Sequence, residues 1–468
     1  METRPVPTKI PTLAPLLAVL MVSHVACGDS GGGDPQDSGV SEDALADAAP
    51  GDDAQTLQPL TWSTPLNLSE SVTFSDIKLN WGNSIALSHG GTVQVVWREV
   101  TDVQGNLITG KVVHRSKDQT GWLPVQDLSP LSAGTGHPKV ASPGDVNVYV
   151  TWHQFDPDPA GDDSIFVAVS DSSGQVGTFT APQAIVTDAV VTAQSPLQEM
   201  ATSPSIAATG DWVYVVWADD RVVSSCGFNV SEVYLMASGD RGLQWDGPHM
   251  VTTPDCRSSW TPTVAAADSY VHVAWTDERH SASDCGLGGS PCEEEEYYRR
   301  LADHGATPDP DELRLTYDDP SALAQSWAGN ITLTADPGGG PHMVHYAWMD
   351  NVGSDDFEVY YRRSPNDGAS WPGGPMQLSP TTPGWLSARP TIAGEGYVVH
   401  VVWMDVQGDT AATISHRWSD DGGFNWSDVS DVTSGTGTFA IQPSVAYGDG
   451  RVHVVWNDQA EIWYATSP

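Results

Sequence analysis

A pattern of hydrophobic and polar positions recurs seven times between residues 60 and 468. Each copy has a short Pro-x-Val/Ile-Ala segment, then an alternating run rich in β-branched residues that ends in Trp, usually followed two positions later by Asp. Such runs predict short strands that are buried on both faces. The residues that end the seven runs are Trp97, Trp152, Trp217, Trp275, Trp348, Trp403 and Trp456.

Each repeat holds two further strands, which makes four per unit. A third strand follows each Trp run, as in residues 232–236 and 358–362, and a fourth has the form Trp-x-x-Pro-x-x-Leu-Ser, as in residues 371–379. Four short antiparallel strands repeated around an axis are typical of a β-propeller, so we predict an all-β fold of four-stranded blades. We expect seven blades, and six remain the alternative if one unit is irregular.

The last repeat lacks its fourth strand. Residues 461–467 supply a third strand with nothing after it, whereas the missing pattern is found at residues 62–69. We therefore predict that this N-terminal strand completes the last blade and covers an edge that would otherwise stay exposed.

The first 59 residues do not share the repeat. Residues 1–26 combine Arg4 and Lys9 with a short apolar stretch, which is typical of an export signal, and residues 27–59 predict an acidic, unstructured tether. The Ala-Cys junction at Cys27 resembles the lipobox of bacterial lipoproteins, although His24 stands where that motif usually has Leu. The resemblance implies a lipid on Cys27 and a place in the bacterial cell envelope; ordinary export is the alternative.

The charge of the chain limits its partners. With 60 acidic and 20 basic residues the formal net charge is −40. Binding to nucleic acid requires clustered Lys and Arg, so we exclude it, and we expect contact with a membrane only through the lipid. We expect a monomer whose partner is a glycan, a peptide or a cell-surface protein, with no required cofactor.

Tight turns between the third and fourth strands carry a second motif. It has the form Ser-x-Asp/Asn-x-Gly-x-x-Trp and occurs in full at residues 238–245, 364–371 and 419–426. The motif resembles the Asp-box, or bacterial neuraminidase repeat, of the sialidase superfamily. The resemblance implies a structural role, in which the carboxylate or amide caps backbone N–H groups and Gly allows a positive φ.

The resemblance raises the question of sialidase activity. Hydrolases of that superfamily have an arginine triad for the sugar carboxylate, a Tyr/Glu nucleophile pair and an acidic Asp. The first repeat reads Asp-Ile-Lys-Leu-Asn at residues 76–80 and lacks the Arg-Ile-Pro segment of those enzymes. The arginines that could reach the ligand face, Arg221, Arg257, Arg279 and Arg389, occupy unlike positions in their repeats, so no catalytic residue is assigned. The enzyme hypothesis stays an alternative to a non-catalytic binding protein.

Other candidates lie on the face that carries the loops after the second strands. The motif Trp-x-Asp places Asp219, Asp277, Asp350, Asp405 and Asp458 there, either as an acidic rim for Ca²⁺ or a polyhydroxyl ligand, or as structural caps and partners of Arg221 and Arg279. The residues before the first-strand prolines are predicted to surround the channel mouth: His137, Ser203, Thr261, Arg389 and Gln442. Histidines three positions before the Trp residues are expected to pack between blades rather than bind a metal.

The remaining cysteines predict two disulfides. Four are left in an oxidising compartment once Cys27 is lipidated, and their loop positions favour Cys226–Cys256 and Cys285–Cys292. The second pair closes the longest loop of its kind, which makes blades three and four the predicted recognition edge. The alternative is an insertion that needed pinning, with the acidic run 293–296 merely solvated.

Overall fold

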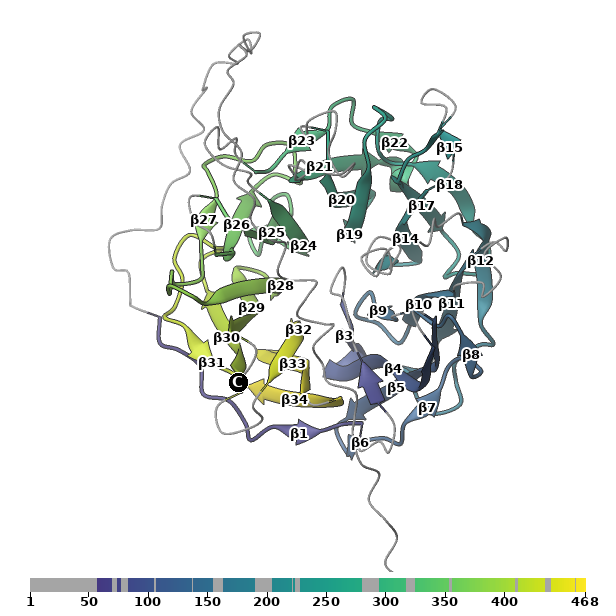
Figure 1. The fold of residues 1–468 in the computed structure, drawn as a ribbon, viewed down its shortest axis with the longest axis horizontal. Coiled ribbons are helices and arrows are strands. Elements are labelled where there is room, and N and C mark those ends of the chain that lie inside the picture. The colour runs from purple at the N-terminus through teal and green to yellow at the C-terminus, as the bar shows by residue number, and fades with distance from the viewer. Residues whose placement is uncertain are drawn as a thin grey trace, which may run out of the picture. The chain divides into compact units, whose positions relative to one another are not determined.

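The computed structural model describes residues 57–69, 74–76, 83–104, 107–136, 138–154, 163–189, 204–220, 222–223, 228–279, 294–316, 325–352, 356–408, 411–433, 439–458 and 460–468. They form a seven-bladed β-propeller with four-stranded antiparallel blades (Figure 1). Two single-turn 3-10 helices, His89–Gly91 and Asp303–Gly305, are the helical elements of this described part. None of its helices is long and apolar enough to cross a bilayer. The predicted fold class and blade number are confirmed.

Extra strands occur in blades 1, 3 and 4, whereas blade 2 has only four strands. Blade 1 consists of β3 (Ile85–Ser88), β4 (Thr92–Gln104), β5 (Leu107–Asp118), β6 (Gly121–Trp122) and β7 (Gln126–Asp127), joined by β2 (Phe74–Asp76) and β8 (Ser132–Ala133). Blade 2 consists of β9 (Lys139–Ala141), β10 (Val148–Gln154), β11 (Asp163–Ser170) and β12 (Gln183–Ala189). Blade 3 consists of β13 (Ser205–Thr209), β14 (Trp212–Asp219), β17 (Glu232–Ser238) and β18 (Asp246–Met250), with the hairpin β15 (Val222–Val223) and β16 (Phe228–Asn229). Blade 4 consists of β19 (Ser259–Ala267), β20 (Tyr270–Asp277), β21 (Glu295–Ala302), β22 (Thr307–Pro308) and β23 (Leu313–Arg314).

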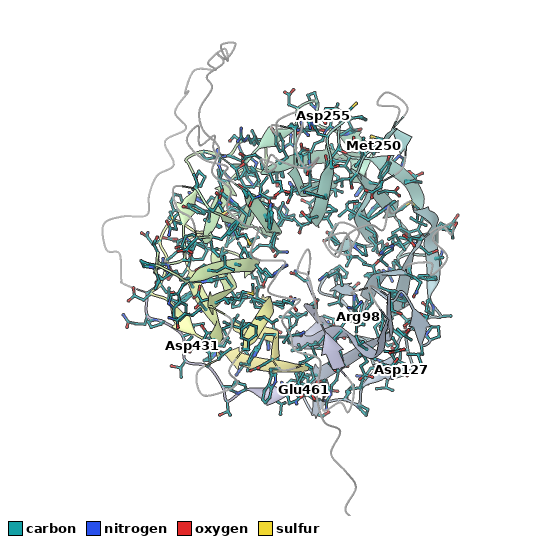
Figure 2. The ribbon with its side chains drawn as sticks, in the orientation of Figure 1. Arg98, Asp127, Met250, Asp255, Asp431 and Glu461 are labelled. Atoms are coloured by element: carbon teal, nitrogen blue, oxygen red, sulfur yellow. The ribbon has the colours of Figure 1, made fainter. Side chains whose placement is uncertain are left out.

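The last three blades follow the simple pattern. Blade 5 consists of β24 (Ser326–Thr334), β25 (Met343–Asp350), β26 (Glu358–Ser364) and β27 (Met376–Gln377). Blade 6 consists of β28 (Leu386–Glu395), β29 (Val398–Gln407), β30 (Ala411–Ser419) and β31 (Ser430–Asp431). Blade 7 consists of β32 (Ala440–Gly448), β33 (Arg451–Asp458), β34 (Glu461–Ser467) and β1 (Leu66–Asn67). Arg98 of β4 lies towards the centre of the ring, whereas Asp127 and Asp431 lie at its outer edge (Figure 2).

Apolar side chains join each blade to the one before it. All seven tryptophans of the repeat are at most 1% exposed. Trp275 of blade 4 shares an apolar cluster with Val216 and Leu235 of blade 3. Trp97 of blade 1 likewise packs with Val455 and Ile462 of blade 7. Close packing between blades is therefore what turns the sequence repeat into a ring.

The N-terminal strand closes the ring as predicted. β1 pairs antiparallel with β34, so that Leu66 lies opposite Tyr464. The chain before β1 also contacts blade 6, because Trp62 Nε1 donates to Ser430 Oγ at 3.3 Å and Trp418 Nε1 donates to the Gln58 carbonyl at 2.9 Å. The closing segment therefore covers the outer edges of two blades.

The Leu-Ser ending of the fourth strand has a definite role. In blade 5, Ser379 Oγ accepts a hydrogen bond from the Val359 amide at 2.8 Å and donates one to Glu358 at 2.5 Å. Leu378 beside it is buried. Blade 3 repeats the arrangement with Thr252, and Ser69 of the closing segment repeats it in blade 7. The motif thus ties the outer strand to the third strand.

The three turns that carry the second motif have the expected hydrogen bonds. Asp240 Oδ1 accepts from the amides of Leu243 and Gln244 at 3.1 and 2.8 Å. In each turn the serine hydroxyl accepts from the glycine amide: Ser238 from Gly242, Ser364 from Gly368, and Ser419 from Gly423. The three glycines have φ between 74° and 88°. The structural role of these residues is confirmed.

Histidine–tyrosine pairs lie behind these turns. Three of the predicted packing histidines bond through Nδ1, each at 2.7 Å, to a tyrosine hydroxyl of the neighbouring strand: His272 to Tyr298, His345 to Tyr361, and His453 to Tyr464. Tryptophans of the next blade cover the tyrosines edge-on, as Trp371 covers Tyr298. Burial lowers the pKa of His272 and His345 to about 3, so these rings are neutral structural groups.

Candidate functional site

We call the end of the ring where second strands end and third strands begin the top. The Trp-x-Asp carboxylates lie there, but they are turned into the blades. Trp275 Nε1 and Ser259 Oγ donate to Asp277 Oδ2 at 2.8 and 2.9 Å. Asp350 and Asp405 make the same two contacts in blades 5 and 6, and Asp219 accepts the Trp217 indole bond in blade 3. The structural interpretation of these residues is favoured over a rim for Ca²⁺.

Blade 7 departs from this arrangement. Ala440 stands opposite Asp458, where blades 4 to 6 have a serine. Among the described residues, neither Asp458 Oδ1 nor Trp456 Nε1 has a hydrogen-bond partner, although both are buried.

The residues predicted to surround the channel mouth are less exposed than expected. Thr261, Arg389 and Gln442 occupy a bulge at the same place in β19, β28 and β32, with φ between 52° and 58°. Their exposed fractions are 9%, 7% and 4%, so they are not the accessible surface that the sequence suggested. Burial lowers the pKa of Arg389 to about 10. His137, Ser203 and Arg221 lie outside the described residues.

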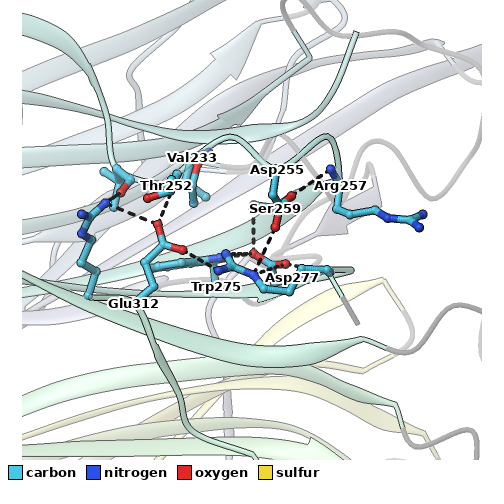
Figure 3. A network of polar contacts seen from close by, with 12 residues as sticks. Val233, Thr252, Asp255, Arg257, Ser259, Trp275, Asp277 and Glu312 are labelled. Atoms are coloured by element: carbon cyan, nitrogen blue, oxygen red, sulfur yellow. Dashed lines mark hydrogen bonds and ion pairs between the residues drawn. The ribbon is translucent and has the colours of Figure 1, made fainter. Parts of the chain in front are cut away.

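A polar network on blade 4 includes Asp255, Asp277 and Glu312 (Figure 3), and Arg279 forms ion pairs with all three. Its guanidinium forms ion pairs with Asp277 at 2.6 Å, Glu312 at 2.7 Å and Asp255 at 3.5 Å, and it lies 4.1 Å from the ring centre of Tyr297. These carboxylates raise the pKa of Arg279 despite its burial. The network connects the blade 3–blade 4 crossing, the end of β20 and the turn before β23. The Arg279 guanidinium therefore binds carboxylates of the chain itself, as the structural interpretation of Asp277 predicted.

The predicted disulfides can be followed only in part. Cys256 lies in the crossing beside this network, has φ 68° and is disulfide-bonded. Cys226, Cys285 and Cys292 lie outside the described residues, as does Cys27. Both pairings and the lipid therefore stay predictions.

A group of buried carboxyls lies at the inner top of blade 4. Glu294, Glu295 and Glu296 are at most 5% exposed, so the idea of a solvated acidic run is wrong for them; Glu293 is outside the described residues. Burial raises the pKa of Glu295 to about 7 and that of Glu296 to about 8. For Glu294, burial and the adjacent carboxyls of Glu278 and Glu296 hold the pKa well above its usual value.

One tryptophan, Trp327, contacts these carboxyls, and Trp260 lies two residues after Ser258, whose carbonyl accepts from the Glu278 amide at 3.0 Å. Trp260 and Trp327 occupy equivalent positions on the inner strands of blades 4 and 5, where blades 6 and 7 have Ala388 and Ile441. Both indoles are partly exposed. Trp327 Nε1 donates to the Glu294 carboxylate, and its ring centre lies 5.8 Å from that of Phe357.

Glu278 completes this cluster directly after β20. It is partly exposed, and burial raises its pKa to about 7. Trp260, Trp327, Glu278 and Glu294 form what we call the blade 4–5 site. Sequence reasoning missed it, although a Ser-Trp pair at the start of the inner strand occurs only in these two repeats.

A Tyr/Glu pair is present nearby, but it is inaccessible. Tyr346 donates a hydrogen bond to Glu296, and both side chains are completely buried. The resemblance to sialidases implied an exposed pair beside an arginine triad, and no such triad is formed by the described arginines discussed above. Within the described residues, no group of three or more His, Cys, Asp or Glu side chains could hold a metal ion.

Comparisons with known proteins were made at the level of sequence and of structure. No protein-family model matches the chain, and no curated protein matches its sequence. Two structures of a polysaccharide lyase, an ulvan lyase, one of them bound to -[GlcA(1-4)Rha3S]-, match with TM-scores of 0.52 and 0.53. Both are 12% identical, over 87% of this chain and 94% of theirs.

A weaker match is a Hadza microbial sialidase, with a TM-score of 0.45 and 12% identity over 84% of this chain and 65% of that one. At such identities a likeness shows the fold alone. The chain is therefore similar in fold to the propeller of a polysaccharide lyase.

Proposed function

We propose that this propeller binds a neutral glycan at the blade 4–5 site. The observation that carries the proposal is the pair of partly exposed indoles, Trp260 and Trp327, on neighbouring inner strands beside Glu278 and Glu294. An indole face offers an apolar surface to a sugar ring, and carboxyl oxygens accept hydrogen bonds from its hydroxyls. The sugar-acting propeller that shares the fold supports a glycan over a peptide or a protein partner, as an analogy.

A neutral glycan fits better than an anionic one. Recognition of a carboxylate or sulfate requires available cationic donors, and Arg is the residue best suited to it. Arg279 is held by three carboxylates of the chain itself, and Arg389 is buried. Arg257 is partly exposed, but it lies close enough to Glu278 to lower the pKa of that carboxyl, so its charge is opposed by the site itself. The site also lies among carboxyls in a chain with a net charge of −40, which repels anions.

The proposal can be tested on the full chain with Cys27→Ser, which cannot be lipidated at that position. A panel of neutral hexasaccharides (cello-, xylo-, malto- and chitohexaose) is compared with sialylated and sulfated glycans by calorimetry. We expect a neutral member to bind, with affinity reduced about tenfold or more by Trp260→Ala or Trp327→Ala. Leu243→Ala, in an exposed turn at the opposite end of the ring, is the control. Binding confined to anionic glycans, or unaffected by both tryptophan changes, would contradict the proposal.

One observation favours a sugar-cleaving enzyme as second candidate. A partly exposed carboxyl with a pKa of about 7, as in Glu278, keeps part of its proton at neutral pH and could protonate a leaving group. A glycosidase of sialidase type would cleave a fluorogenic sialoside. Another glycosidase would release reducing ends from the bound hexasaccharide, with turnover but not binding lost in Glu278→Gln. Binding without any turnover leaves the non-catalytic function.

We also infer that the protein is exported and anchored through Cys27, because the leader and acidic tether precede the propeller in sequence. Residues 1–56 lie outside the described part. Labelled palmitate should enter the full chain and not the Cys27→Ser variant. Incorporation that survives the substitution would contradict a lipid on Cys27, and no incorporation in the full chain would leave ordinary export as the explanation.

A further inference from the structure

Three residues at the boundary of blades 4 and 5 break the pattern of the other repeats. Tyr346 stands two positions before Trp348, where the other six repeats have valine. Glu296 lies opposite the residue after Trp275, where the third strands of the other blades have Val or Ile. Gly329 occupies the bulge position that is proline in blades 4, 6 and 7.

The three exceptional residues meet in space. The Tyr346 hydroxyl donates to Glu296, and a Cβ on residue 329 would overlap that hydroxyl. The other carboxyl oxygen of Glu296 lies 3.0 Å from Thr276 Oγ1, which can accept the O–H of a neutral Glu296 and donate to Thr261 Oγ1 at 2.7 Å. A polar bridge, defined as Tyr346, Glu296 and Gly329, thus replaces the aliphatic contact found between the other blades. Because burying a carboxyl is costly and an aliphatic pair packs there at five other blade boundaries, stability alone does not account for the bridge.

The bridge lies close to two members of the blade 4–5 site, Trp327 of β24 and Glu294 directly before β21. Glu294 lies two residues before Glu296, and Trp327 lies two residues before Gly329. Those two also contact each other, since Trp327 Nε1 donates to Glu294 and the Ser326 amide donates to the Glu294 carbonyl at 2.8 Å. Building on the function proposed above, we propose that the bridge positions Trp327 and Glu294 for the glycan and does so only while Glu296 is neutral. Tyr346 and Glu296 are positioning residues, because both are buried away from any ligand.

The surroundings of Glu296 explain the requirement for a neutral carboxyl. Its neighbours are the hydroxyls of Tyr346 and Thr276 and the acidic groups of Asp350, Glu295 and Glu294. Burial raises the pKa of Glu296 to about 8; the hydrogen bonds with Tyr346 and Thr276 oppose this rise, and the charges of Asp350 and Glu295 add to it. Ionisation of Glu296 would add a negative charge to a buried acidic group, so the strands that hold Trp327 and Glu294 should separate.

A measurement without ligand tests the bridge. Acrylamide quenching due to Trp327 is obtained as the difference between the protein and its Trp327→Phe variant. We expect this quenching to rise with pH, with a midpoint near 8, and to stay low in Glu296→Gln, whose amide has the shape of the neutral acid. Tyr346→Phe should raise it already at pH 7. Glu395→Gln, an exposed position, is the control and should keep the transition.

A second measurement concerns binding. Affinity for whichever neutral hexasaccharide binds should fall about tenfold from pH 7 to pH 9 in the protein and stay within about twofold in Glu296→Gln. A quenching transition that persists in Glu296→Gln, or its absence between pH 6 and 10 in the protein, would overturn the inference. If no hexasaccharide binds, the proposed function fails while the quenching experiment still decides on the bridge.

Discussion

Single residues decide how the top edge of each blade is held. In blades 4, 5 and 6 a serine of the inner strand and a tryptophan of the second strand satisfy the same aspartate, as Ser326 and Trp348 do for Asp350. Blade 7 has Ala440 in place of the serine, and Asp458 Oδ1 is left without a partner among the described residues. A buried acceptor without a partner lowers stability, because its lost hydration is not replaced.

Ala440→Ser should therefore stabilise the protein. The new hydroxyl can donate to Asp458, and we expect a gain of about 1 kcal/mol in the free energy of unfolding. Ser326→Ala removes the same bond from blade 5 and should cost about 1 to 3 kcal/mol. Urea unfolding of both variants measures the two values. The explanation fails if Ala440→Ser has no effect or Ser326→Ala costs nothing.

At the scale of elements, a turn of one blade is seated on the third strand of the blade before it. Gly368 in the turn of blade 5 covers the hydroxyl of Tyr298, which also bonds His272. Trp371 of the same turn packs edge-on against that tyrosine, with ring centres 5.0 Å apart. The glycine is needed twice, for its φ of 74° and because a Cβ would overlap the tyrosine hydroxyl.

Gly368→Ala separates these two demands when compared with Gly373→Ala. Gly373 has a similar φ of 71°, but a Cβ there meets nothing within 4 Å. The free energy of unfolding of the control, Gly373→Ala, should fall only by the cost of placing alanine in a left-handed conformation, about 1 to 2 kcal/mol. The free energy of unfolding of Gly368→Ala should fall by about 3 to 5 kcal/mol, because the overlap with the tyrosine hydroxyl adds to that cost. Equal losses in thermal or urea unfolding would show that the contact between turn and strand contributes nothing.

At the scale of the whole molecule, stability depends on the closing strand. β1 is joined to β34 by backbone pairing, and Ser69 bonds both the Ile462 amide and the Glu461 carboxylate. Deleting residues 60–70 should expose the edge of β34 and cause aggregation. Ser69→Ala, which keeps the strand, should lower the melting temperature without aggregation. Size-exclusion chromatography distinguishes monomer from aggregate in both variants. A deletion variant that stays monomeric and equally stable would contradict the role of β1 in closing the ring.

The pH dependence of stability is also a property of the whole ring. Burial raises the pKa of Glu232, Glu278 and Glu295 to about 7 and that of Glu296 to about 8, so the folded state holds these protons longer than the unfolded state. Their contribution is present below about pH 4.5 and is lost as pH rises through 7 to 8.

The buried histidines act in the opposite sense. Burial lowers the pKa of His114, His272, His345 and His400 to about 3, so the unfolded state takes up protons first as pH falls below 6.5. Stability should therefore decline above pH 6.5 because of the carboxyls, and below pH 4.5 because of the histidines. Melting temperatures across buffers of constant ionic strength test this, and Glu296→Gln should flatten the decline above pH 6.5. A melting temperature that rises from pH 6.5 to 8 would contradict the sign.

The sequence by itself determined the architecture of the described part. Seven alternating runs that end in Trp predict seven buried second strands, and the pattern at residues 62–69 predicts the strand that closes the ring. These inferences hold because strand periodicity, turn chemistry and the Leu-Ser ending are local features that recur from one repeat to the next. The capping role of Asp240 follows in the same way, since its partners lie three and four residues away.

The tertiary structure decided which polar groups are buried and which meet. Asp277, Arg389 and Glu296 read as exposed candidates or solvated residues in the sequence, yet each is covered, because burial depends on what the neighbouring blade places against it. Tyr346 and Glu296 are 50 residues apart and touch only because blade 5 packs against blade 4. The sequence marks both as exceptions to the repeat, but their contact is a property of the packed blades, since it requires two different blades to face each other.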